Sequence, residues 1–182
     1  MNLEEKTVKQ TMLHRGRIVN LREDDVRLPN GNLAKREVVE HPGGVSVVAL
    51  DELNRVLFVR QFRYPYERVL LEIPAGKLSP GEDPLECGKR ELKEETGAVG
   101  EAYQSLGVLY PSPGYCDEII YLYITRVTEM KQASPDEDEF LEVEKIPLET
   151  AVEMILAGQI EDAKTQTAVL KTAMLLRTGS II

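Results

Sequence analysis

The chain has 182 residues, of which 42% are hydrophobic and 29% charged, a composition typical of one globular domain rather than a disordered chain. Its formal net charge of −9 argues against nucleic acid as a partner, because binding to a phosphate backbone depends on Lys and Arg. No apolar run approaches the roughly 18 residues that a membrane span needs, and the polar first residues lack the apolar centre of a secretory signal. Two cysteines and two histidines give poor support for zinc, so we expect reduced thiols in a cytoplasmic protein without a membrane partner.

Residues 1–42 have the pattern of a small antiparallel β-sheet. Short strands are expected at residues 18–22, 25–28 and 35–39, and Pro29-Asn30-Gly31 has the composition of a hairpin turn. A sheet this small buries little apolar surface alone, so we expect it to pack on another surface. The break at His41-Pro42-Gly43-Gly44 marks the start of a second domain, expected over residues 43–182.

The second segment predicts a mixed sheet covered by helices. The nearly continuous apolar runs 45–50 and 56–59 are typical of strands that are buried on both faces. Further strands are expected at 69–73, 103–110, 117–126 and 140–146, and helices at 148–156 and 163–176. The whole chain therefore predicts an α+β fold: an α/β/α sandwich with a mixed sheet, plus the small N-terminal antiparallel β-sheet.

A further helix is expected directly after Asp83. This residue is a suitable N-cap, Pro84 follows at the first helical position, and Glu86 stands where it would complete a capping box. Gly97 follows the last turn, where a left-handed residue commonly ends a helix.

Three carboxylates, Glu91, Glu94 and Glu95, crowd the last turns of this helix. Like charges four residues apart repel by roughly 0.2–0.5 kcal/mol, and each acid near a helix C-terminus costs a further ~0.3–1 kcal/mol at an exposed site. A divalent cation would convert this arrangement into a binding site, because hard ions such as Mg²⁺ take oxygen ligands. The alternative is a solvated face of ion pairs, since basic residues are interspersed at Lys89, Arg90 and Lys93.

The wider spacing favours the metal site. Gly76 is followed after five residues by Glu82, and after seven more by the run Arg90-Glu91-Leu92-Lys93-Glu94-Glu95-Thr96-Gly97-Ala98. This pattern resembles the complete signature box of the Nudix hydrolase family, with every fixed identity at the family spacing. The fold expected above is then a Nudix-type sandwich.

The resemblance implies that Mg²⁺ or Mn²⁺ is bound by Glu91, Glu94 and Glu95, with the carbonyl oxygen of Ala75 as a further ligand. Such ions shield phosphate oxygens and lower the pKa of bound water. Arg90 is similar to the family arginine that orients the glutamates through ion pairs. Glu95 and Arg90 are therefore expected to take part in catalysis, Arg90 by supporting the glutamates. Glu82 resembles the glutamate that anchors the loop to the helix.

Residues outside the box resemble the ADP-ribose pyrophosphatase subfamily, which carries a proline about fifteen residues beyond the box, as Pro113 is here. The stretches 59–63 and 72–78 are also similar to that subfamily. The resemblance implies hydrolysis of ADP-ribose to AMP and ribose 5-phosphate, with Arg63 in contact with the substrate phosphates. The alternative for Arg63 is an ion pair at a strand end. The other substrate-binding residues expected are Arg60, Arg36, Pro113 and Gly114.

An acidic loop precedes residue 140, and in it Glu139, with Glu137 as neighbour, is similar to the family's mobile-loop glutamate. That residue completes the metal shell or acts as general base, so both glutamates join the catalytic set and Glu139 the metal ligands. A loop that closes on substrate would also exclude water. The alternative is solvated charge in a very acidic loop.

In the subfamily the N-terminal segment crosses to a second subunit and helps to build the adenosine pocket of a homodimer. The present segment has no aromatic residue before His41, and the chain has no Trp, so apolar residues or Arg36 of the partner subunit are expected to hold the base instead.

Three other functions remain open. GDP-mannose, or another nucleoside-diphosphate sugar, is the nearest rival substrate. Tyr115, seventeen residues past the box, keeps a dinucleoside polyphosphate substrate open. A sensor that binds ADP-ribose without cleaving it belongs to a different class, and the intact set Glu91, Glu94 and Glu95 argues against it.

Overall fold

The computed structural model describes residues 2–137 and 139–180. It divides the chain into two compact units. The first consists of residues 1–43 together with the loop 110–119, and the second of residues 44–109 and 120–182. Each unit is described by itself below.

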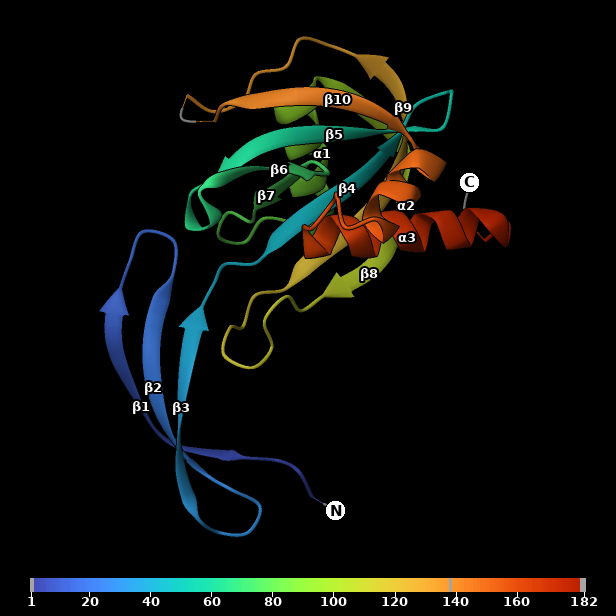
Figure 1. The fold of residues 1–182 in the computed structure, drawn as a ribbon. Helices are drawn as coiled ribbons and strands as arrows, with labels where there is room; N and C mark the ends of the chain where they lie inside the picture. The colour runs from blue at the N-terminus through green and yellow to red at the C-terminus, as the bar shows by residue number, and fades with distance from the viewer. Residues whose placement is uncertain (1, 138, 181–182) are drawn as a thin grey trace. The chain divides into compact units, whose positions relative to one another are not determined.

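The first unit contains a three-stranded antiparallel sheet in the order β1-β2-β3 (Figure 1). Its strands are β1 (Lys6–Arg15), β2 (Asn20–Arg27) and β3 (Leu33–Glu40). The hairpin turn predicted at residues 29–31 is confirmed, with Gly31 at a φ of 89° and its N–H donating to the carbonyl of Leu28. β1 was not expected, and its residues are almost all exposed, so that its apolar pattern is weak.

The two short strands expected at 18–22 and 25–28 form one strand, β2. The acidic residues between the two expected strands continue the ladder, because Lys35 of β3 pairs with Glu23 and lies 3.5 Å from Asp25. Cross-strand pairs of opposite charge stabilise a sheet.

The loop 110–119 of this unit is attached to the end of β3. The Val39 N–H donates to the Tyr115 carbonyl at 2.7 Å, and the Asp117 N–H donates to the Val39 carbonyl at 3.1 Å. A carboxylate oxygen of Asp117 accepts from the N–H of His41. Pro113 and Gly114 lie exposed in this loop.

The second unit is built on a seven-stranded mixed sheet with the order β10-β5-β4-β9-β8, to which β6 adds on β5 and β7 on β4. Within the described residues of this sheet, β4 and β9 are the one pair of strands that runs in parallel. The strands are β4 (Gly44–Leu50), β5 (Arg55–Arg63), β6 (Arg68–Glu72), β7 (Ala75–Lys77), β8 (Ala98–Leu109), β9 (Ile120–Met130) and β10 (Leu141–Pro147).

The expected strands are all present, with shifted ends. β8 starts five residues earlier than expected, β9 runs over 120–130 instead of 117–126, and the three-residue β7 was not expected. β7 contains Gly76, which is a poor strand former, so its pairing with β4 depends on tertiary context.

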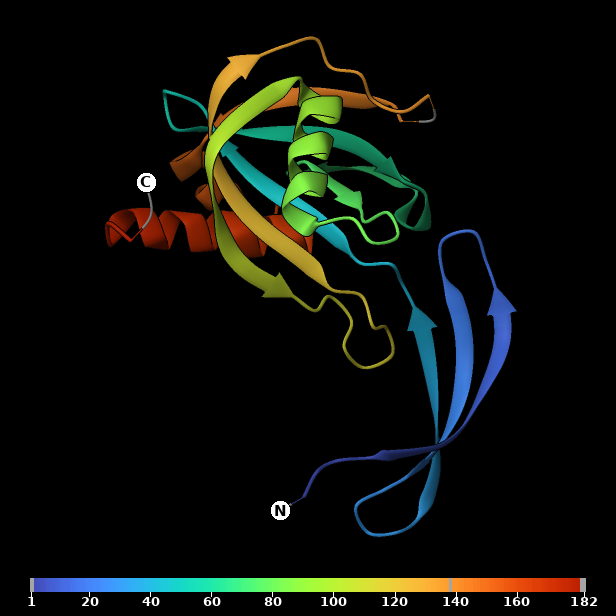
Figure 2. The same cartoon turned by 180° about the vertical axis from the view of Figure 1, so that it is seen from behind.

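Helices cover both faces of this sheet. α1 (Pro84–Thr96) lies on one face, and α2 (Leu148–Leu156) and α3 (Ala163–Arg177) lie on the other (Figures 1 and 2). Neighbouring residues of one strand enter opposite cores: Leu57 packs with Leu92 of α1, and Phe58 packs in the larger cluster with α2 and α3. The predicted α/β/α sandwich is therefore confirmed. Among the described residues no helix is both long and apolar enough to cross a bilayer.

Candidate active site

Local signals fix both ends of α1. The Asp83 carboxylate accepts hydrogen bonds from the N–H groups of Leu85 and Glu86, at 2.9 and 3.2 Å. Gly97 ends the helix in the left-handed region at a φ of 74°. The capping box is only half formed, because the Glu86 carboxylate pairs with Lys89 rather than returning a bond to the cap.

Glu91 and Glu95 are buried against β7, with exposures of only 9% and 2%. The cost of an acid at an exposed helix end therefore does not apply to these two. A Cβ added to Gly76 would lie 1.9 Å from the carboxylate carbon of Glu91, so only glycine leaves room for that side chain. The Ala75 N–H donates to Glu95 at 3.1 Å. β7 and the last turns of α1 thus hold both carboxylates in the protein interior.

Because Glu91 and Glu95 are buried, their negative charges are poorly compensated. Burial raises the pKa of Glu95 to about 8, a rise reinforced by the charges of Glu91 and Glu139 and opposed by the Ala75 N–H and Arg63. Burial also raises the pKa of Glu91, against the opposing charge of Arg90. Both carboxyl groups would be stabilised in their ionised form by a nearby cation.

Arg90 connects the carboxylates to the loop before the helix. Its Nε and Nη2 donate to the two oxygens of Glu82 at 3.0 and 3.2 Å, and its Nη1 lies 2.8 Å from Glu91 and 2.9 Å from Glu94. Glu82 also accepts from the Ser79 N–H, and the hydrogen bond from Arg90 lowers the pKa of Glu82 to about 2. These contacts fit the supporting roles expected for Arg90 and Glu82.

The ligand atoms that this site offers suit a hard divalent cation. They are oxygens only, and two of the carboxylates are buried with raised pKa values. Within residues 2–137 and 139–180, however, no three acidic, His or Cys side chains already surround a cation position. Glu91 and Glu94 instead face the Nη1 group of Arg90, which a cation would have to share or replace.

The acidic loop places Glu139 near the buried pair. Its charge contributes to the raised pKa of both Glu91 and Glu95, and its N–H donates to the Asp136 carbonyl. Glu137 is exposed, and its role stays a prediction, as does that of Glu139.

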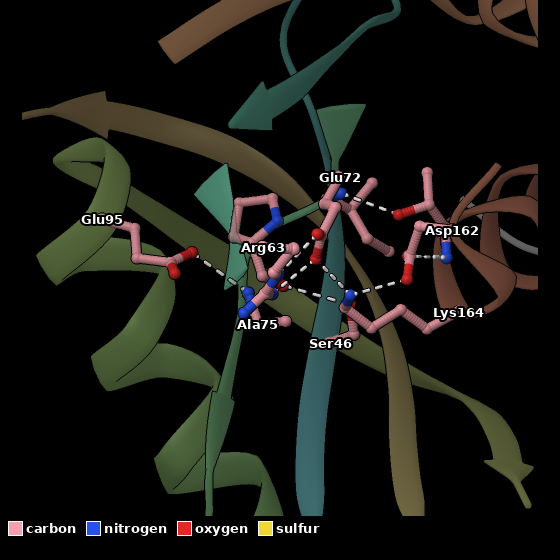
Figure 3. A network of polar contacts seen from close by, with 10 residues as sticks. Ser46, Arg63, Glu72, Ala75, Glu95, Asp162 and Lys164 are labelled. Atoms are coloured by element: carbon pink, nitrogen blue, oxygen red, sulfur yellow. Dashed lines mark hydrogen bonds and ion pairs between the residues drawn. The ribbon is translucent and has the colours of Figure 1, made fainter. Parts of the chain in front are cut away.

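Arg63 forms the ion pair that was the alternative to a phosphate contact. Its Nε and Nη2 donate to the two carboxylate oxygens of Glu72, at 2.7 and 2.6 Å (Figure 3). No hydrogen bond among the described residues uses Nη1. The charge of Arg63 also opposes the rise in the pKa of Glu95.

Of the other expected substrate-binding residues, one belongs to the second unit and three belong to the first. Arg60 of β5 forms a half-exposed ion pair with Glu144 of β10 at 2.9 Å. Arg36 pairs with Glu5 within the first unit, to which Pro113 and Gly114 also belong. All four assignments stay predictions.

Sequence reasoning missed Glu72, Lys164 and Asp162, which continue the chain of ion pairs that starts at Arg63. One signal was present: Glu72 is the only charged residue in the apolar run 69–73, and a charge in such a run is normally paired when buried.

Two family models match adjoining parts of the chain. The NUDIX domain model matches residues 40–167, and the model described as nucleoside diphosphate sugar hydrolase N-terminal domain matches residues 5–39. Since the first match covers more than half of the chain, the protein belongs to the NUDIX family, and the expected membership is confirmed.

Curated relatives span nearly the same length. The chain is 42% identical over 171 residues to an ADP-ribose pyrophosphatase of Bacillus subtilis (strain 168), with 92% of each chain covered. It is 46% identical over 168 residues to a methanol dehydrogenase activator of Bacillus methanolicus, with 91% of each covered. A GDP-mannose pyrophosphatase of Enterobacter sp. (strain 638) is 38% identical over 154 residues, covering 77% of this chain and 79% of that one.

A solved structure described as an ADP compounds hydrolase matches with a TM-score of 0.85 over 100% of both chains. At 21% identity this match shows that the two proteins share a fold.

Proposed function

We propose that the protein hydrolyses the diphosphate bond of ADP-ribose, giving AMP and ribose 5-phosphate, with a divalent cation, Mg²⁺ or Mn²⁺. The observation that carries this proposal is the buried pair Glu91 and Glu95, packed against Gly76 and Ala75 with Arg63 nearby. The similarity to an ADP-ribose pyrophosphatase over 92% of each chain supports the choice of substrate.

In this proposal Glu91, Glu94, Glu95 and the Ala75 carbonyl hold the cation. When bound, the cation shields the phosphate oxygens and lowers the pKa of the attacking water. Arg90 keeps Glu91 and Glu94 in position through its ion pairs.

The remaining roles concern the substrate and the water. Arg63 binds the diphosphate through the Nη1 group that its pairing with Glu72 leaves unused. Glu139, with Glu137 as neighbour, completes the metal shell or takes the proton of the water that adds to one phosphorus as the bridging P–O bond breaks.

The test is a panel of substrates with Mg²⁺: ADP-ribose, GDP-mannose and a diadenosine polyphosphate, with release of the mononucleotide as the readout. We expect the highest kcat/KM for ADP-ribose, and Glu95→Gln should lower turnover by about 100-fold or more. Glu86→Gln is the matched control, because that exposed carboxylate on the same helix forms its ion pair with Lys89. Binding of ADP-ribose without release of AMP would instead indicate a sensor.

The relative named methanol dehydrogenase activator supports a second candidate, stimulation of a dehydrogenase. Adding the wild type and Glu95→Gln to a methanol dehydrogenase assay separates the two. Stimulation by the wild type alone would make hydrolysis the cause, whereas equal stimulation by both would indicate a function without hydrolysis.

We also propose that the protein acts in the cytoplasm as a homodimer, with the N-terminal β segment, residues 1–42, exchanged between subunits and residues 43–182 forming the hydrolase domain. Support comes from apolar side chains left exposed on the small sheet, including Val8, Leu13 and Leu33. Light scattering should find a dimer for the wild type and a monomer for Leu33→Asp. Leu53→Asp, at an equally exposed position in the second unit, is the control.

A further inference from the structure

Four charged side chains form a continuous network behind the proposed phosphate-binding arginine. Glu72, at the end of β6, is only 1% exposed. Its carboxylate receives the two hydrogen bonds of Arg63 and a third from the Lys164 ammonium. Lys164 also donates to Asp162 at 2.9 Å. The network therefore runs from β5 through β6 to the first turn of α3 (Figure 3).

The first turn of α3 also binds the backbone segment that runs from Glu72 to Ala75. The hydroxyl of Thr165 accepts from the N–H of Ile73 at 3.0 Å. The carbonyl of Pro74 accepts from the hydroxyl of Ser46 at 3.1 Å and from the N–H of Val47 at 2.9 Å. Each residue from Glu72 to Ala75 therefore makes at least one hydrogen bond that fixes its position. For Ala75 this bond goes from its N–H to Glu95.

The geometry around Arg63 fixes the direction of its unused donors. Two of its three nitrogens are held by Glu72 in a bidentate pair, which sets the plane of the guanidinium. Lys164 fixes the position of that same carboxylate from the side of α3. The four charges of the network sum to zero, and because Asp162 pairs with Lys164, Arg63 shares the carboxylate of Glu72 with a second cation.

This network contributes to stability, but its geometry also suits a second role. Burial would raise the pKa of Glu72, but the hydrogen bond from Arg63 and the charge of Lys164 outweigh burial, and the pKa lies below its ordinary value. A buried ion pair repays its desolvation cost only with good geometry, and apolar replacement of a whole pair is often neutral. A role in orienting a reacting group gives this cluster a function that an apolar cluster could not fulfil.

We propose that Lys164 is a positioning residue for hydrolysis: it locks Glu72, and Glu72 orients Arg63 toward the substrate diphosphate. This inference rests on the proposed function for the identity of the substrate. α3, whose first turn is ninety-two residues from Glu72 in sequence, thereby becomes part of the active-site support.

The test is a double-mutant cycle on the full-length protein with ADP-ribose and Mg²⁺. Lys164→Met should raise KM by about 10-fold, the scale seen when a residue that orients a ligand group is lost, with a smaller change in kcat. Lys164→Arg, which keeps the positive charge, should have a KM near the wild-type value. In the Arg63→Ala background, Lys164→Met should have no further effect, because Lys164 acts through Arg63.

Lys171→Met is the matched control, since this lysine of the same helix donates to the Leu106 carbonyl and, among the described residues, forms no ion pair. Should Lys164→Met fail to fold, Lys164→Gln takes its place in the cycle. An unchanged KM, or effects of Lys164 and Arg63 that simply multiply, would overturn the inference while leaving the proposed function intact. A wild type that cleaves no member of the substrate panel would refute the proposed function and this inference with it.

Discussion

The two faces of the main sheet differ in what they bury. The face covered by α2 and α3 encloses a large cluster of apolar side chains. The face covered by α1 has a small apolar cluster around Leu92, and beside it the buried carboxylates Glu91 and Glu95. Apolar burial stabilises a fold by roughly 25 cal/mol per Å² removed from water, whereas an incompletely compensated buried carboxylate destabilises it. Burial on the apolar face therefore stabilises the fold, and part of this stability offsets the cost of burying the carboxylates on the other face.

The strands between these faces serve both. In β4 and β5 successive residues alternate between the two cores, as Leu57 and Phe58 do. Substitutions on either face should therefore have separable effects on stability and activity.

The largest expected effect is that of Glu95→Gln. Hydrolysis should fall by about 100-fold or more, the scale of losing one group that stabilises transition-state charge. Without a divalent cation, the variant should be at least as stable as the wild type at pH 8, because the amide carries no charge to bury. Steady-state kinetics and thermal unfolding in a chelator check both parts. A variant of much lower Tm would show that Glu95 supports the fold instead.

Leu57→Ala and Leu122→Ala test the two faces with the same chemical change, since both leucines are almost fully buried, on opposite sides of the sheet. Each should cost about 2–5 kcal/mol in the free energy of unfolding. Only Leu57→Ala, which loosens the packing under α1, should also lower kcat/KM of the folded protein. Equal activity losses would mean that the faces are not separable.

The stability of the cation-free protein should depend on pH in the direction set by Glu95. Its pKa in the folded protein, about 8, lies above the ordinary value for glutamate, so its contribution to stability is present at low pH. That contribution should be lost as the pH rises from about 5 through 8. Tm measured over this range should decline more steeply for the wild type than for Glu95→Gln, and Mg²⁺ should reduce the difference. Parallel curves would contradict the buried-charge account.

Substitution of Glu82 should have the smallest effect on stability, and its pH dependence should have the opposite sign to that of Glu95. Its pKa of about 2 is below the ordinary value, so its contribution to stability is present above about pH 4.5 and is lost toward pH 2. Glu82→Gln should therefore have a slightly lower Tm than the wild type at pH 6, and the difference should shrink below pH 4.5 and vanish toward pH 2. A Tm difference that stays constant down to pH 3 would show that the Arg90 contact does not depend on charge.

How much the sequence predicts depends on how local the signal is. The ends of α1 follow from Asp83 and Gly97, which act within one helical turn, and the bounds of α2 match the expected range. The burial of Glu91 could not be predicted in this way, because it depends on Gly76, fifteen residues earlier and on another element.

The support around Arg63 was the least predictable part. The resemblance indicated Arg63 itself, but Glu72 and Lys164 meet only when β6 and α3 pack together. β1 was missed for the related reason that its residues are almost all exposed and carry little pattern. Long-range packing, rather than local propensity, determined each of these features.

The central claim is that Glu91 and Glu95 bind a divalent cation. Calorimetric titration of Mn²⁺ into the protein with AMP present, repeated at pH 7 in buffers of different ionisation enthalpy, tests it most directly. The wild type should take up the ion and release protons, because cation binding ionises Glu95, whose pKa burial raises to about 8. The Glu91→Gln, Glu95→Gln double variant should do neither. No uptake by the wild type, or equal uptake by both proteins, would contradict the account.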